Sequence, residues 1–465
     1  MGNDYPVTPL TETDVDRMRF RLLSPRVRGN SLYGSPMHYG FAMGFLRQAS
    51  RNTPVPFIYK ADYQMRHGFF LVTTKGKGKG PIVLLSPVGN PEVMAPKIAE
   101  FARKLAERTC QPVIIKKADP LLERELIKYG FGDYRPGEEW DKRAPKDDDT
   151  YRNPVVFVDD IARPSMTLAK RIRKRENEFN NSIRKIFGKD AKVELNEYDP
   201  IKDRESGDVI LHHWASEFAL RKNEDPENAI AANEIFLRIR PDFSNLATYI
   251  TRVKDIDKGL LKKHILKLEN EISKLPSPEG NSQKLVQLGN LVALYTLGLG
   301  KGYVPIGFST FERTGFVTHK SIEALNASLP SEVIALTKAQ MALEAKKKKI
   351  LIADLKKTAM NDLGSIINRD SKVRADRLTP LSALALTANI AIVPAVKQAG
   401  FMQLYASIRK LAEKKGKSIS PVAMINLGGS ENPEQHDFKM AFDPRFALRN
   451  WHLVMYPPTH KKERE

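Results

Sequence analysis

Apolar and polar positions along the chain predict strands and helices in turn. Three short apolar runs at residues 56–62, 67–76 and 81–87 are separated by turn residues, which is typical of successive strands. A helical pattern follows from Pro91 to Arg108, in which Ile98, Phe101 and Leu105 recur at roughly helical spacing. The pattern continues with a strand at 112–119, a helix at 120–130 and a strand at 153–160. We therefore expect a mixed α+β fold.

The second part of the chain continues this mixture. Ser165 or Thr167 can cap a helix that runs to about Ile186. The pattern next predicts a strand at 191–199, helices at 209–221, 229–239 and 243–253, and a charged amphipathic helix at 255–275. Further strands are expected at 304–311 and 381–393, and a further helix at 402–415. A long helical pattern at 331–368 is typical of a hairpin arm or a coiled-coil surface.

The stretch from Pro421 to Phe442 contains the best candidate site. Its apolar run predicts a strand, Gly428 and Gly429 predict a turn, and the residues after Pro433 predict a helix. Glycine lets backbone N–H groups approach a ligand, and open α/β sheets bind ligands at the carboxyl ends of their strands. The polar candidates at this corner are Ser430, Glu431, His436 and Lys439. An ordinary strand-to-helix turn with a solvated helix face explains the same pattern, so both interpretations stay open.

Two parts of the chain resemble a known family. INLGGSE at 425–431, followed by DFKMAFDPRF at 437–446, is similar to the last third of the phosphatidylglycerol lysyltransferase C-terminal family. GDYRPGEEW at 132–140, with residues 155–180, is similar to that family's strand and basic helix, whereas residues 254–378 match no part of it. The resemblance implies two GNAT-type acyltransferase folds in tandem and transfer of an acyl or aminoacyl group.

The predicted element order of the first half agrees with one GNAT fold. We therefore expect two GNAT-like mixed β-sheets flanked by helices, with a helical insertion in the second. The charged, proline-containing linker at 141–149 separates the halves. It predicts domains at 1–150 and 151–465, with the insertion around 254–378.

Charge and composition narrow the choice of partners. Lys and Arg number 75 against 55 Asp and Glu, a net charge of +20 that favours RNA, DNA, an anionic membrane surface or a nucleotide cofactor. The single cysteine, Cys110, excludes an intramolecular disulfide and a cysteine-cluster metal site. The first residues lack the basic and apolar regions of a secretory signal, and the longest apolar stretch is shorter than the ~20 residues of a membrane span. We expect a soluble, cytoplasmic protein.

A cluster of five basic residues lies within the helix predicted after Ser165. Its members, spread over more than one helix face, are Lys170, Arg171, Arg173, Lys174 and Arg175. Such a cluster can bind phosphate groups of a nucleic acid in a salt-dependent way. A solvated helix face is the alternative, and the sequence leaves both open.

Three other motifs favour structural explanations. Lys75, Lys77 and Lys79 alternate with glycines but join two strands, which indicates a hairpin turn more than a phosphate loop. His212 and His213 are adjacent on a helix, so their side chains diverge and favour ordinary helix residues over a metal site. The glycines at 298, 300 and 302 precede a strand, which indicates a loop and no dinucleotide site. No metal site is expected.

The turn before the helix at 402–415 bears on the donor. In GNAT enzymes the equivalent turn is a glycine-rich loop that binds the coenzyme A pyrophosphate. Here only Gln398 and Gly400 fit, and the expected second glycine is missing. This departure weakens the case for an acyl-CoA donor. It leaves an aminoacyl-tRNA as the donor, which the resemblance also implies. We expect no tightly bound cofactor.

The leading hypothesis is an acyl or aminoacyl transferase acting on an amine or hydroxyl acceptor. Glu431 is the candidate base and His436 the second, because such chemistry needs a deprotonated nucleophile. Gly428 and Gly429 would supply backbone donors, with Ser430, Lys439, Gln398 and Gly400 binding the donor. The rival hypothesis is a non-catalytic nucleic-acid-binding or scaffold protein on a degenerate transferase fold. The partners expected under the two hypotheses are tRNA or another polyanion, an anionic membrane surface, or a protein, including a second copy, bound through the helical insertion.

Overall fold

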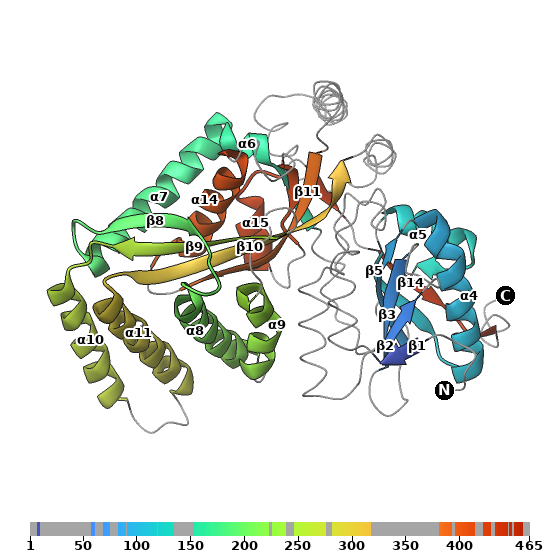
Figure 1. Ribbon diagram of the computed structural model, residues 1–465, viewed down its shortest axis with the longest axis horizontal. Helices are drawn as coiled ribbons and strands as arrows, with labels where there is room; N and C mark the ends of the chain where they lie inside the picture. Colours follow the sequence, from blue (N-terminus) through green and yellow to red (C-terminus); the bar gives the residue numbers. More distant parts are fainter. Residues whose placement is uncertain are drawn as a thin grey trace. The chain divides into compact units, whose positions relative to one another are not determined.

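The computed structural model describes sixteen stretches of the chain (Figure 1). They are residues 7–9, 57–60, 68–74, 82–89, 91–118, 120–133, 153–222, 226–238, 246–275, 281–317, 381–392, 396–413, 422–428, 433–444, 446–448 and 451–458. The domain boundary predicted at residue 150, the lysines of the 75–79 loop and the helical pattern at 331–368 lie outside them. So do Gly429, Ser430 and Glu431 of the glycine corner.

The described strands form two seven-stranded sheets. The first has the order β1-β2-β3-β4-β5-β14-β6. Its strands are β1 (Val7–Pro9), β2 (Phe57–Lys60), β3 (Gly68–Thr74), β4 (Ile82–Gly89), β5 (Val113–Ala118), β14 (Trp451–Met455) and β6 (Gly132–Asp133). Neighbours are antiparallel from β1 to β4, β4 and β5 are parallel, and β14 is antiparallel to both β5 and β6. The sheet is therefore mixed, and a strand from the end of the chain completes it.

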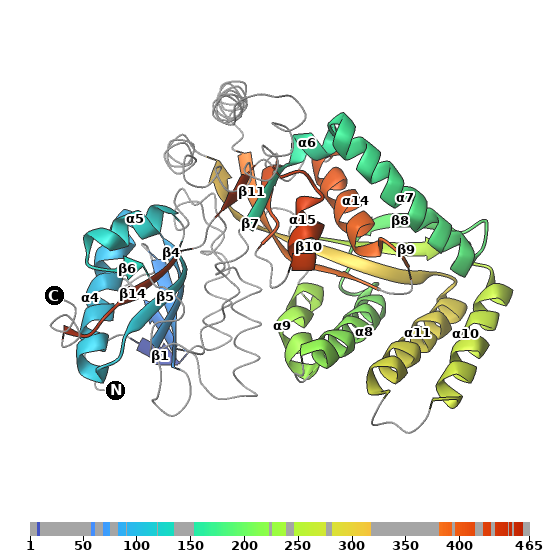
Figure 2. The same ribbon diagram turned by 180° about the vertical axis from the view of Figure 1, so that it is seen from behind.

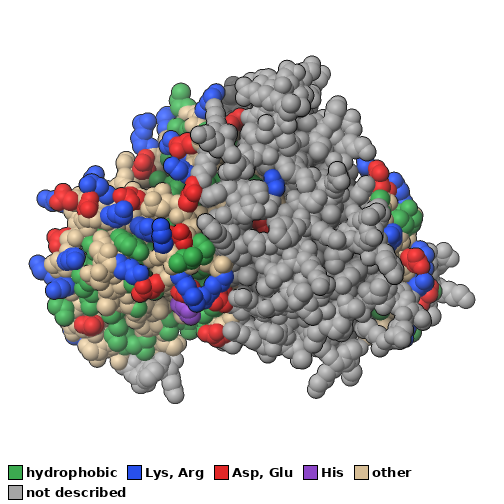
Figure 3. Space-filling view, viewed as in Figure 1, with side chains coloured by type: hydrophobic (Ala, Val, Ile, Leu, Met, Phe, Trp, Pro, Cys, Tyr) green, Lys and Arg blue, Asp and Glu red, His purple; other side chains and the backbone are tan. Residues whose placement is uncertain are grey.

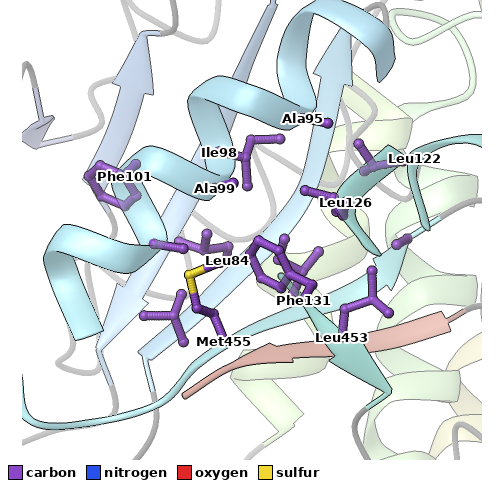
Figure 4. Packing of buried hydrophobic residues seen from close by; sticks show 14 of the residues in the cluster. Leu84, Ala95, Ile98, Ala99, Phe101, Leu122, Leu126, Phe131, Leu453 and Met455 are labelled. Carbon is purple, nitrogen blue, oxygen red and sulfur yellow. The ribbon is translucent and has the colours of Figure 1, made fainter. Parts of the chain in front are cut away.

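Two helices, α4 (Pro91–Thr109) and α5 (Pro120–Lys128), pack on this first sheet (Figure 4). The helical spacing of α4 places Ile98, Phe101 and Leu105 in the core, each less than a tenth exposed. Leu84 of β4 and Leu453 of β14 face them, fully buried. Burying a side chain of this size contributes about 1.5–3 kcal/mol, so this shared core holds β14 in the sheet.

The second sheet has the order β13-β7-β12-β11-β10-β9-β8. Its strands are β13 (Phe446–Leu448), β7 (Asn153–Phe157), β12 (Val422–Asn426), β11 (Leu381–Ala391), β10 (Val304–Val317), β9 (Leu246–Lys254) and β8 (Lys192–Glu197). Strands β11 and β12 are parallel, whereas the pairs β12–β7, β13–β7, β10–β9 and β8–β9 are antiparallel. The predicted fold class, α+β with two mixed sheets flanked by helices, is confirmed.

Helices cover both faces of the strands β8, β9 and β10 (Figures 1 and 2). On one face lie α7 (Met166–Phe187) and α14 (Ala399–Glu413), with the short α6 (Val158–Ala162) beside α14. On the other face lie α8 (Arg204–Lys222), α9 (Pro226–Arg238) and the antiparallel pair α10 (Lys258–Ser273) and α11 (Ser282–Lys301). The α10–α11 hairpin connects β9 to β10, within the range where a helical insertion was predicted. A last helix, α15 (Pro433–Met440), follows β12.

The helix predicted at 243–253 is wrong, because the structure has strand β9 there. Ala247, Thr248, Tyr249, Ile250 and Thr251 are all buried, since helices cover both faces of this part of the sheet. Such a strand shows no alternation of apolar and polar residues, so periodicity cannot distinguish it from a buried helix. Its β-branched residues were the signal that favoured a strand.

The loop predicted around the glycines at 298–302 is shorter than expected. Gly298 and Gly300 lie inside α11, and only Gly302, with φ of 73°, ends the helix in the left-handed conformation. At Gly298 an added Cβ would lie 2.3 Å from Cγ2 of Val304. The close approach of β10 to the last turn of α11 therefore explains this glycine.

Contacts divide the chain into two compact units. The first contains residues 1–157, 313–385 and 420–465, and the second contains residues 158–312 and 386–419. None of the helices among the described residues is both long and apolar enough to cross a bilayer.

Candidate functional site

The predicted glycine corner forms at the carboxyl end of β12, in the first unit. The backbone N–H of Leu427 donates to the carbonyl oxygen of Pro154 on β7 at 2.9 Å, which fixes the end of the strand. The chain then turns at Gly428, whose φ of 75° lies in the left-handed region that glycine favours. The side-chain oxygen of the buried Asn426 accepts from the Gly428 N–H at 2.8 Å. The strand and the turn are thus where the sequence predicted them.

Helix α15 returns Lys439 to this corner. The Lys439 ammonium donates to the carbonyl oxygen of Gly428 at 3.0 Å. Phe438 of this helix and Phe442 just after it meet edge to face, with ring centroids 5.8 Å apart, and Phe442 is buried. An ammonium has three donors, and one of those of Lys439 fixes the carbonyl of the turn. The structure therefore brings together Gly428 and Lys439, two of the residues predicted for donor binding.

His436 lies one turn before Lys439 on the same helix and is partly buried. Burial lowers the pKa of its imidazole below the usual value, and the Lys439 charge acts in the same direction, whereas Asp437 opposes the shift. A lower pKa keeps the ring neutral at physiological pH. His436 can therefore accept a proton, as a general base must.

A second group of predicted residues meets in the second unit, where α7 contacts the start of α14. The guanidinium of Arg175 donates to the side-chain oxygen of Gln398 at 3.4 Å and lies 4.3 Å from the centroid of the Phe401 ring. The Gln398 amide donates in turn to the carboxylate of Glu178 at 2.9 Å. Gln398 itself has φ of 63°, which is uncommon for a residue with a side chain. Two α7 side chains thus hold the turn before α14 in a specific conformation.

Gly400 takes part in this arrangement through its backbone. Its carbonyl oxygen accepts from the side-chain amide of Asn389 on β11 at 3.1 Å. The oxygen of the same amide accepts from the hydroxyl of Ser309 on β10 at 2.7 Å. A line of hydrogen bonds therefore runs from β10 through β11 to the first turn of α14. It fixes the backbone of Gly400, which lies in the first turn of α14 two residues after Gln398.

The five basic residues of α7 differ in their surroundings. Ser165, one of the two caps that the sequence offered, caps the helix by accepting from the Leu168 N–H at 3.2 Å. Lys170, Arg173 and Lys174 are exposed, whereas Arg171 and Arg175 are partly buried. Burial, and then the charge of Arg171, lowers the pKa of Arg175, while Glu178 raises it. Only Arg175 of the five contacts Gln398.

Glu178 and Asn389 belong to the contact at the start of α14, and sequence reasoning missed both. Asn389 had a usable signal, because it is a polar residue within the apolar strand at 381–391. Glu178 had none, because its partner Gln398 is 220 residues away along the chain. Side-chain pairing over such a distance leaves no trace in a local pattern.

The sequence was compared with known protein families and with curated proteins, and neither comparison gave a match. Among solved structures, the chain is similar to a conserved protein of unknown function from Bacteroides thetaiotaomicron, at 10% identity and a TM-score of 0.48, covering 97% of this chain and 98% of that one. It is similar to the C-terminal domain of a protein named as a lysylphosphatidylglycerol synthetase from Agrobacterium fabrum, at 7% identity and a TM-score of 0.44, covering 97% and 94%. It is also similar to L-PGS from Bacillus licheniformis, at 8% identity and a TM-score of 0.44, covering 97% and 92%.

Proposed function

We propose that this protein is an acyl or aminoacyl transferase that moves an activated acyl group to an amine or hydroxyl acceptor. The observation that supports this best is the corner after β12. There a left-handed Gly428, a neutral His436 and the Lys439 ammonium belong to one strand–turn–helix unit. The Gly428 N–H itself donates to Asn426, so the backbone donors that acyl transfer needs are assigned to the following glycine of the sequence pattern, Gly429. His436 supplies the base and Lys439 the fixed cation.

The chemistry assigns a role to each group. The acceptor's amine or hydroxyl attacks the carbonyl carbon of the donor, and the base takes the proton that the nucleophile loses. The new bond forms as the bond between the acyl carbon and the donor's leaving oxygen or sulfur breaks, and the base then gives its proton to that leaving atom. Two residues are candidates for this base. His436 lies within the described residues, and Glu431, predicted from the sequence pattern, lies outside them. Lys439 acts as a positioning residue, because its bond to the Gly428 carbonyl holds the turn.

An aminoacyl-tRNA suits this chain better than an acyl-CoA donor. In GNAT enzymes, coenzyme A binding needs an anion site at the start of the helix that corresponds to α14. Here Glu178 and Arg175 both bond to the Gln398 side chain, so the two charges at that place offset each other, and the second glycine expected for a pyrophosphate loop is missing. The exposed Lys170, Arg173 and Lys174 of α7, in contrast, suit the phosphates of a larger polyanion.

The decisive experiment measures transfer from two radiolabelled donors, a mixed pool of aminoacyl-tRNAs and acetyl-CoA. The acceptors are vesicles containing phosphatidylglycerol and, separately, a lysine-containing peptide. We expect transfer from aminoacyl-tRNA that His436→Gln lowers by about 10²–10⁴-fold, the usual contribution of a general base. Glu434→Gln, an exposed change on the same helix, is the matched control and should leave the rate unchanged.

The same experiment tests the rival hypothesis of a non-catalytic nucleic-acid-binding protein. The exposed basic residues of α7 favour that function equally. Filter binding of tRNA with increasing salt, run on the same variants, separates the two. Binding that weakens with salt, together with no transfer from either donor to either acceptor, would contradict the transferase proposal. Transfer that His436→Gln leaves intact would instead contradict the role given to His436.

A further inference from the structure

The second unit contains an open cavity of about 500 Å³ between α8 and α11. Its walls come from the turn before α8, from the first three turns of α8 and from one side of α11. In Figure 3 a histidine and several charged side chains of both signs lie together over the α8 region. Ligand cavities usually measure about 300–1,000 Å³, so this one has room for a small organic molecule.

The charges around the cavity leave a positive excess. Three basic and two acidic side chains line it, and both acids already have partners. Glu205 pairs with Lys301 at 2.5 Å, and Asp208 lies 3.9 Å from Arg204. Lys202, in contrast, makes no ion pair with any residue in the described stretches. An incoming anion would therefore meet a cation that has no partner, beside an Arg204 that is held only loosely.

The rest of the lining is apolar or neutral. Val209 of α8 and Ala293 of α11 supply apolar surface. His213 also lines the cavity, and its side chain is only 2% exposed. Within the described residues neither of its ring nitrogens has a hydrogen-bond partner, and Glu217 lies 3.5 Å away, beyond a good hydrogen bond. Burial lowers the pKa of His213 to about 4, so the ring is neutral and can donate from one nitrogen and accept at the other.

We propose that this cavity binds a small organic anion, with the anionic group against Lys202 and Arg204 and the uncharged body against Val209 and Ala293. The anionic group is a phosphate monoester or a carboxylate. No three His, Cys, Asp or Glu side chains among the described residues are placed to hold a metal ion, so the attraction comes from the basic side chains. The site does not depend on the transferase proposal, because it lies between α8 and α11 and uses none of the residues given a role in transfer.

The test is ligand-observed NMR on the full chain with two probes, ribose 5-phosphate and N-acetylglycine. Ala293→Trp places an indole in the cavity from an exposed position of α11 and should abolish binding. Thr296→Trp adds the same side chain at an exposed position of the same helix that does not line the cavity, and should leave binding unchanged. Lys202→Gln should weaken binding about tenfold, the effect of one charge-assisted hydrogen bond.

Binding of ribose 5-phosphate alone identifies a phosphate monoester as the ligand, and binding of N-acetylglycine alone identifies a carboxylate. Binding of both means that the site accepts either group, and each of these results supports the proposal. Binding of neither probe, or equal loss in Ala293→Trp and Thr296→Trp, overturns it. Should Ala293→Trp fail to fold, Lys202→Gln is compared with Lys189→Gln, an exposed change outside the cavity. Equal affinities in that pair would also overturn the proposal.

Discussion

The buried imidazole of His213 should make the second unit lose stability as the pH falls. Its side chain is 2% exposed, and burial lowers its pKa to about 4, against about 6.5 for a solvated histidine. Unfolding releases the ring into water, where it binds a proton more readily. The unfolded state therefore gains protons first, and the stability is fully present above the unfolded pKa.

The size of this effect follows from the two pKa values. Each unit of difference is worth about 1.36 kcal/mol, so the whole difference amounts to about 3 kcal/mol once the pH is below both values. Between about pH 7 and about pH 5 the free energy of unfolding should fall by about 2 kcal/mol on this account. A change of this size is a large part of the stability of a typical domain.

The assay follows urea unfolding through the fluorescence of Trp214, the next residue on α8. Its ring stacks on Phe218 with centroids 5.1 Å apart, so its emission reports on this helix. Replacing Trp140 and Trp451 by Phe leaves Trp214 as the only tryptophan. His213→Leu in this background should remove the pH dependence, because leucine fills the space and cannot bind a proton.

His212→Leu is the matched control. His212 is the neighbouring residue and is exposed, so its replacement should leave the pH dependence as in the parent protein. An equal fall in stability for the parent and His213→Leu would refute the reasoning. It would mean that Glu217, whose carboxylate oxygen lies 3.5 Å from Nε2 of His213, moves in to pair with the protonated ring and restores its pKa.

Two pairs of substitutions test the packing of α11 against β10 and of α7 against the start of α14. Gly298→Ala should lower the free energy of unfolding by about 1–3 kcal/mol, because its Cβ would lie 2.3 Å from Val304, whereas Gly289→Ala has open space on the same helix and should raise it by up to about 1 kcal/mol. Urea unfolding measures both changes, and a change of the same sign in the free energy of unfolding of the two variants would contradict the close approach of α11 and β10. Arg175→Met should cost about 1–3 kcal/mol through its lost contacts with the start of α14, while the exposed Lys174→Met should cost less than about 0.5 kcal/mol. Similar losses for the two variants would rule out a structural role for Arg175.

The features that the sequence predicted well are those formed by residues close together along the chain. The strand, glycine turn and helix around Gly428 depend on neighbouring residues, since an apolar run, a residue tolerant of positive φ and a proline-started helix follow one another directly. The same holds for the cap of α7 by Ser165 and for the helix α4. In each case the signal and the structure occupy the same few residues.

Features made by distant residues could not be predicted in this way. Strand β14 joins the first sheet from the far end of the chain, because its apolar residues complete the core under α4. The cavity beside α8 needs α11, about 80 residues further on, and no sequence period encodes that pairing. The prediction of a helix at 243–253, where the structure has β9, was wrong for a related reason. Burial on both faces of the sheet removes the alternation of apolar and polar residues that identifies a strand.

The basic cluster of α7 shows how a fold can divide one sequence feature between two roles. All five residues lie within two turns of one helix, so by sequence they form a single positive field. The packing of α14 against α7 withdraws Arg175 from solvent and commits it to Gln398 and Phe401. Lys170, Arg173 and Lys174 keep their ammonium and guanidinium groups in water, where counterions can be exchanged for phosphates. We therefore expect polyanion binding by α7 to depend on these three exposed residues, and the conformation of the turn before α14 to depend on Arg175.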